Sequence, residues 1–160
     1  MLPILIVDDS REDIALATRV LSQCGVRNPV QIMLSGRECI DFFARSIDKP
    51  ESPLPCVVFL DLMMSPISGV EVLRRLRDRP LAQSSIFVML SGASDYTMVR
   101  DGYQLGAATF VVKPLTCEEV IRTFKNLRGV VLKRQSDGYE VVCMERKDQT
   151  RMPELPSAVA

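Results

Sequence analysis

Five short apolar runs recur along the chain, separated by segments with helical periodicity. Each run is apolar nearly throughout and ends at polar residues; the runs cover residues 3–7, 30–34, 56–60, 85–90 and 109–112. Continuous apolar runs are typical of strands that are buried on both faces, whereas a strand with one wet face alternates apolar and polar residues. The pattern therefore predicts five strands of a parallel sheet.

The segments between the predicted strands carry apolar residues at helical spacing and begin at capping signals. Ser10, followed by the acidic residues Glu12 and Asp13, starts the first helix, and Ser35 with Glu38 has the spacing of a capping box. Further helices are predicted within residues 70–78, 95–105 and 116–128. Five strands that alternate with five helices indicate an α/β fold with helices on both faces of the sheet.

Polar residues follow the predicted strands at the edge where open parallel sheets place their binding sites. Asp8 and Asp9 follow the first strand, while Asp61 ends the third; Ser91 and Lys113 follow the fourth and fifth. Each has an ordinary explanation, since an aspartate often caps a helix, a serine often sits in a turn, and a lysine before proline is usually solvated. A buried charge is costly unless it is paired or bound to metal, so their convergence would indicate a site.

The residue types at this edge suit phosphoryl chemistry. Crowded carboxylates repel one another and raise at least one pKa, and a hard divalent cation such as magnesium relieves that repulsion. A serine hydroxyl and a lysine ammonium can bind the oxygens of one phosphoryl group. Asp61 is then the candidate nucleophile that forms an acyl phosphate. Because no glycine-rich phosphate loop precedes a helix, a nucleotide site is disfavoured.

Composition narrows the function classes. With 160 residues, of which 47% are hydrophobic, the chain can bury one core and carry an appendage. Twenty basic and twenty acidic residues cancel, so net charge gives no argument for a nucleic-acid or membrane partner. The chain has five scattered cysteines and no histidine. Zinc sites of the usual kind and histidine-based catalysis are therefore excluded, and the chain cannot itself be a phosphohistidine donor.

The N-terminal apolar run does not predict a signal peptide. Its apolar residues end at Val7 and are followed by Asp8 and Asp9, and no apolar run approaches the length of a membrane span. We therefore expect a cytoplasmic protein that does not insert into a membrane.

These residues together resemble a response-regulator receiver domain, the CheY-like module of two-component systems. The resemblance covers about residues 2–127, and the acidic pair, Asp61, Ser91 and the Lys113-Pro114 dipeptide occur in the order of the family; Met64 and Gly69 have its spacing from the acceptor. The resemblance implies a doubly wound, flavodoxin-like sheet in the order 2-1-3-4-5. It also implies a phosphorelay, and because residues 129–160 are too few for a DNA-binding output domain, we expect a stand-alone receiver.

The resemblance further implies how the switch works. A sensor histidine kinase or a histidine phosphotransfer protein would donate a phosphoryl group to Asp61, and the oxygens of that group would bind Ser91 and Lys113. Phe110 would be the switch aromatic that swings inward, and a downstream protein would read the changed face. Magnesium would be held by Asp8 through water and directly by Asp9, Asp61 and the backbone carbonyl of Met63.

Two other functions are left open beside the switch. A degenerate receiver would bind partners without phosphate, and an aspartate-nucleophile phosphohydrolase would turn over phosphoesters. The hydrolase usually needs an acid two residues after the nucleophile, where this chain has Met63. Met63 and Ala93 are apolar where many relatives carry groups that orient water, so we expect slow self-dephosphorylation and no other enzymatic activity.

Residues 129–160 depart from the alternating pattern. Residues 130–133 and 139–144 are rich in β-formers and flank Asp137-Gly138, a hairpin signal, and residues 145–160 are predicted to be disordered. We therefore divide the chain into a receiver domain at 1–128 and an extension at 129–160, with a hairpin at 130–144. A lone hairpin is marginally stable, so it must pack on the receiver or on a second chain, which leaves a homodimer open.

Overall fold

The computed structural model of the chain describes residues 1–45, 56–92 and 96–144. Three predicted features lie outside these described residues: the polar connection before the third strand (46–55), Ala93, and the tail at 145–160 that we predicted to be disordered.

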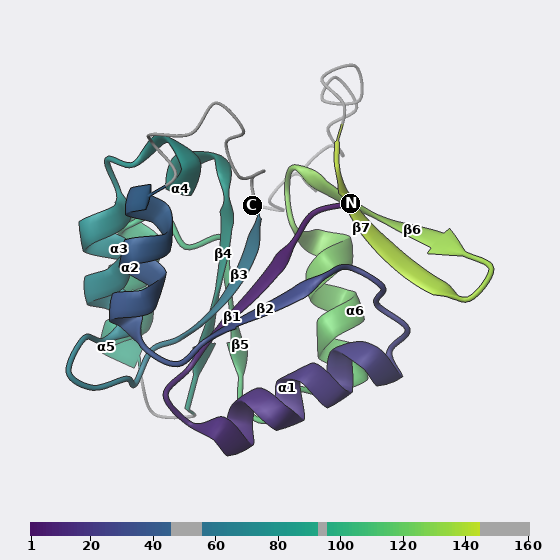
Figure 1. Cartoon of the computed structure of the whole chain (residues 1–160), viewed down its shortest axis with the longest axis horizontal. Coiled ribbons are helices and arrows are strands. Elements are labelled where there is room, and N and C mark those ends of the chain that lie inside the picture. Colours follow the sequence, from purple (N-terminus) through teal and green to yellow (C-terminus); the bar gives the residue numbers. More distant parts are fainter. Residues whose placement is uncertain (46–55, 93–95, 145–160) are drawn as a thin grey trace, which may run out of the picture.

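The five predicted strands form one parallel sheet in the order β2-β1-β3-β4-β5, as the resemblance implied (Figure 1). Every residue of β1 and β3 is buried, because helices cover both faces of the sheet at its centre. The strands are β1 (Ile4–Val7), β2 (Val30–Met33), β3 (Val57–Asp61), β4 (Ile86–Ser91) and β5 (Thr109–Val112).

Two hydrophobic cores lie on the two faces of the sheet. Val57 and Phe59 of β3 belong to one core, and Val58 and Leu60 belong to the other, as the alternation of side chains along a strand requires. Helices α1 (Arg11–Gln23) and α6 (Cys117–Asn126) pack on the first core (Figure 1). The second core is covered by α2 (Gly36–Arg45), α3 (Gly69–Leu76), α4 (Pro80–Ser84) and α5 (Tyr96–Gln104).

One of these helices, α4, was not among the predicted elements. It has five residues with Pro80 at its start, and it is too short to produce a periodic pattern. In the part of the chain that the structure describes, no helix is long and apolar enough to cross a membrane.

The predicted helix caps form. Ser10 Oγ accepts a hydrogen bond of 3.2 Å from the amide of Asp13 at the start of α1. At α2, Ser35 Oγ accepts from the amide of Glu38 at 3.2 Å, while the Glu38 carboxylate reaches back to the amide of Leu34 at 2.9 Å. Both caps lie just after a strand, so they fix where the chain leaves the sheet.

The predicted hairpin consists of β6 (Val130–Gln135) and β7 (Gly138–Cys143), and it packs on the receiver itself (Figure 1). Val130 and Val141 are 5% and 0% exposed and belong to the core that α1 and α6 cover. The amide of Leu2 donates to the carbonyl of Val141 at 3.1 Å. The hairpin therefore closes the end of this core near the chain's first residues.

A buried asparagine side chain joins the hairpin to the receiver. Asn28 is 4% exposed, and its Nδ2 donates to the carbonyls of Leu2 and Val141, each at 2.7 Å. Its Oδ1 accepts from the amide of Val141 at 2.8 Å. One side chain thus satisfies three backbone groups of two segments that are distant in sequence.

Asn28→Ala is expected to lower the free energy of unfolding by about 2–4 kcal/mol, because buried backbone groups lose their partners. Urea unfolding measures this loss, with Asn126→Ala as the control. Asn126 is exposed at the end of α6, and its replacement should change stability by less than about 0.5 kcal/mol. Equal effects of the two substitutions would contradict the anchoring role of Asn28.

Candidate functional site

Three carboxylates meet at the carboxyl ends of β1 and β3. The two strands pair in parallel with Val7 beside Leu60, so Asp8 and Asp61 emerge next to each other. The nearest carboxylate oxygens of Asp8, Asp9 and Asp61 all lie within 4.8 Å of one another. Asp8 and Asp61 are 1% and 5% exposed, whereas Asp9 is exposed to solvent. The predicted acidic cluster therefore forms, with one accessible member.

Backbone hydrogen bonds orient the acidic pair. Asp8 Oδ1 accepts from the amide of Ser10 at 2.8 Å, and Asp9 Oδ2 accepts from the amide of Ser65 at 3.1 Å. The second bond links the loop after β1 to the loop after β3. Gly69 lies so close to the carbonyl of Asp61 that a Cβ atom there would overlap it, which explains the glycine at this position.

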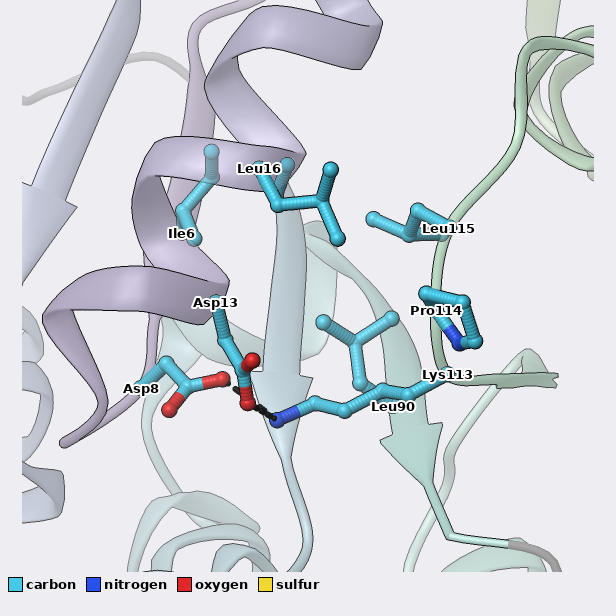
Figure 2. A pocket seen from close by; sticks show the side chains of 9 residues that line it. Ile6, Asp8, Asp13, Leu16, Leu90, Lys113, Pro114 and Leu115 are labelled. Carbon is cyan, nitrogen blue, oxygen red and sulfur yellow. Dashed lines mark hydrogen bonds and ion pairs between the residues drawn. The ribbon is translucent and has the colours of Figure 1, made fainter.

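Among the described residues, Lys113 is the one lysine whose ammonium group contacts this acidic cluster. Its Nζ lies 2.6 Å from Asp8 Oδ2, 2.9 Å from Asp13 Oδ2 and 3.2 Å from Asp61 Oδ1. Figure 2 shows the lysine reaching across from the loop after β5 toward Asp8 and Asp13. Burial alone lowers the pKa of Lys113, but hydrogen bonds to Asp13 and Asp8 and the charge of Asp61 outweigh it and raise that pKa.

The carboxyl group of Asp61 has a raised pKa. Burial is the main cause and the negative charge of Asp8 adds to it, while Lys113 and the amide of Met63 act in the opposite direction. The single positive charge of Lys113 cannot neutralise the negative charges of all the carboxylates around it. The site therefore has an excess of negative charge, held on oxygen atoms that suit a hard divalent cation.

The remaining predicted residues lie around this cluster. Ser91 is the last residue of β4, is 3% exposed, and accepts a hydrogen bond on its carbonyl from the amide of Lys113 at 2.9 Å. Met63 is 61% exposed in the loop after β3. The Phe110 ring faces α5, where its centroid lies 4.6 Å from that of Tyr103. Ser91 thus shares the edge with the acids, whereas Phe110 packs against a neighbouring helix.

Asp13 was not predicted to belong to the site. In the sequence it is an acid in the first turn of a helix, which capping and the helix dipole explain fully. One signal was available, since Asp13 lies in the first turn of a helix whose N-cap, Ser10, directly follows the acidic pair.

The order of the sheet places the molecule among doubly wound proteins, and its acids cluster at the carboxyl edge, where such proteins have their binding sites. The family model of the response regulator receiver domain matches residues 4–125, and the chain belongs to this family.

Relatives in sequence include response regulator Rcp1 of Synechocystis sp., which is 25% identical over 79% of this chain and 84% of its own length. A protein of Vibrio cholerae serotype O1 named "Probable cyclic di-GMP phosphodiesterase" is 28% identical over 91% of this chain. The chain spans only 32% of that protein's length. The similarity therefore concerns one part of the larger protein.

Two solved structures of bacteriophytochrome response regulators, AtBRR and RtBRR, are similar in fold. They have TM-scores of 0.71 and 0.73 and are 28% and 29% identical to this chain. Each comparison covers 85% of this chain, together with 98% of AtBRR and 83% of RtBRR. The similarity therefore extends over most of the fold and is not limited to a few local motifs.

Asp61→Asn is expected to stabilise the metal-free protein at pH 7, because the raised pKa of Asp61 means that folding penalises its ionised form. Below about pH 4 the carboxyl is protonated in both states and the penalty disappears; the penalty grows between the unfolded-state pKa and the folded-state pKa and is fully present above the latter. The stability gain should therefore be present at pH 7 and absent at acid pH.

Urea unfolding in a chelator, at pH 7 and at acid pH, measures this difference. Asp78→Asn removes a carboxyl whose side chain is 89% exposed and should leave stability nearly unchanged at both pH values. A loss of stability at pH 7 in Asp61→Asn would show that the ion pair with Lys113 outweighs burial and the repulsion from Asp8.

Proposed function

We propose that the chain is a phosphoacceptor switch of a two-component phosphorelay and that Asp61 accepts the phosphoryl group. One observation carries the proposal: the buried Asp61 carboxylate lies within 4.8 Å of two other acids and 3.2 Å from the Lys113 ammonium. This arrangement combines a nucleophile, oxygen ligands for a cation and a positive charge for phosphoryl oxygens.

In the proposed step an oxygen of Asp61 attacks the phosphorus of a phosphohistidine on a kinase or a phosphotransfer protein. The new bond joins that oxygen to phosphorus, and the bond between phosphorus and the imidazole nitrogen breaks with its electron pair left on nitrogen. Lys113 and the hydroxyl of Ser91 bind phosphoryl oxygens. The acyl phosphate is hydrolysed later, when water attacks the phosphorus and the carboxylate leaves.

The carboxylate cluster fits magnesium, because magnesium prefers oxygen ligands and is commonly bound by one or two carboxylates. Asp9 and Asp61, with the backbone carbonyl of Met63, would hold the ion directly, and Asp8 would reach it through water. The hydrogen bonding supports this division, since Asp8 already binds Ser10 and Lys113. When bound, the ion would neutralise the carboxylates and the charge on the phosphoryl oxygens.

The output side of the proposal involves Phe110. Its ring lies against α5, where a Cβ atom at Gly102 would come within 2.7 Å of the ring. A phosphoryl group that draws Ser91 inward would open space beside β5, and the ring would leave α5 to fill it. A downstream protein would then read the changed face of α5, β5 and α6.

The proposed unit of switching is one chain, with a receiver at 1–128 and an extension at 129–160. The hairpin finds its packing partner within the chain, so the proposal does not require a homodimer. We assign no turnover of a separate substrate, because the phosphodiesterase activity in a relative's name belongs to a protein about three times as long. The cytoplasmic location stays a prediction from the sequence.

Acetyl phosphate with magnesium should add one phosphoryl group to the wild-type chain, as measured by intact mass. Asp61→Asn should give no adduct, because its amide cannot act as the nucleophile. Asp78→Asn, on the exposed surface after α3, should be phosphorylated like the wild type. Turnover of acetyl phosphate without an adduct would favour the phosphohydrolase, and an unmodified wild type would favour the phosphate-independent binder.

Met63→Asn should shorten the half-life of the phosphorylated chain about fivefold, because an amide there can hydrogen-bond an attacking water. The exposed position of Met63, in the loop after the acceptor, leaves room for such a water. Met63→Leu keeps the site apolar and should leave the half-life unchanged. Loss of the radiolabelled phosphoryl group measures both, and equal half-lives in Met63→Asn and Met63→Leu would contradict the expectation.

A further inference from the structure

Asp13 contributes a contact to Lys113 that the proposed switch does not use. An ammonium group has three protons to donate, and three carboxylates lie around Lys113: Asp8, Asp61 and Asp13. Two of these acids belong to the cluster that would bind the cation, whereas Asp13 stands outside that cluster and comes from the first turn of α1. Any effect of Asp13 on the acidic site would therefore act through Lys113.

The position of Asp13 is fixed by α1. Its amide is bound by Ser10 Oγ at 3.2 Å, and a carboxylate in the first turn is stabilised by the helix dipole. Asp13 and Lys113 meet beside a cavity of about 280 Å³, whose lining includes Leu16, Leu90 and Leu115. Figure 2 shows these side chains around the pair. Apolar walls on one side reduce the screening of the ion pair by water.

We propose that Asp13 is a positioning residue that competes with the phosphoryl group for Lys113. The inference rests on the proposed function and adds a regulatory residue to it. Asp8 and Asp13 form the two short hydrogen bonds of the ammonium, at 2.6 and 2.9 Å, and hold it toward α1. A phosphoryl oxygen must therefore accept its hydrogen bond from the one remaining N–H of the ammonium. The negative charge of Asp13 also repels the phosphoryl anion. Both effects weaken the hold of Lys113 on the phosphoryl group.

The first test measures the affinity of a phosphoryl mimic, beryllium trifluoride, by fluorine NMR at saturating magnesium. Asp13→Asn keeps the size of the side chain and an acceptor oxygen but removes the charge. It should tighten binding about three- to fivefold, the range expected for one partly exposed ion pair. Glu12→Gln removes the neighbouring, exposed charge of the same helical turn and should change the affinity by less than about 1.5-fold.

The second test uses the metal-free protein. Urea unfolding of Asp13→Asn, Lys113→Met and the double variant forms a mutant cycle. If Asp13 acts through Lys113, Asp13→Asn should change the unfolding constant by a factor that differs about two- to fivefold between the wild-type and Lys113→Met backgrounds. An equal factor in both backgrounds overturns the proposal, as does an analogue affinity in Asp13→Asn equal to that in Glu12→Gln.

The two levels of the proposal fail in different ways. If wild type binds the analogue, Asp61→Asn does not, and Asp13→Asn behaves like Glu12→Gln, only the role of Asp13 is wrong. If wild type itself binds no analogue with magnesium present, the proposed phosphoacceptor function is wrong and the inference falls with it.

Discussion

The excess of negative charge at the carboxyl edge of the sheet is the constraint on which the site depends. Asp8, Asp9 and Asp61 hold their oxygens within 4.8 Å of one another, and a single ammonium from Lys113 is shared among its acidic neighbours. Left free, these groups would separate to regain water. They remain together because their backbone positions are set by β1 and β3, every residue of which is buried. The two cores thus hold in place a cluster of negative charges that a hard divalent cation would neutralise.

Much of this arrangement could be predicted from the sequence, for a geometric reason. Short apolar runs that alternate with helical segments indicate strands of a parallel sheet, and parallel strands bring their carboxyl ends to one edge. Burial on both faces holds for the central strands β1 and β3, whereas three of the four residues of the edge strand β2 are exposed. Once the five runs were recognised as strands, Asp8, Asp61 and Lys113 were expected at the same edge of the sheet, although their contacts depend on the strand order and on the loop after β5. The same reasoning fails for side chains whose partners lie outside this edge. Asn28 resembles an ordinary loop residue, yet one of its partners, Val141, lies 113 positions away.

Asp13 escaped prediction for a different reason. Its sequence context already has a complete explanation in helix capping, so nothing in the pattern requires another partner. Only the path of the loop after β5 brings the Lys113 ammonium to within 2.9 Å of it. A local rule that is satisfied can therefore conceal a tertiary contact. The short helix α4 was missed because five residues give too few positions for a helical period to be recognised.

The packing of the molecule also separates a rigid part from a part suited to move. At one end of β1, the amide of Leu2 binds the hairpin, and at the other end the chain presents Asp8. The helix α3 buries five of its residues: Gly69, Val70, Val72, Leu73 and Leu76. In α5, by contrast, Gly102 alone is buried among the residues whose burial is described. Elements with little buried surface open at the lowest free-energy cost. The ring of Phe110 rests on this helix, whereas β1 is bound at both ends, so the switch that we propose would act through α5 and leave the acidic pair in place.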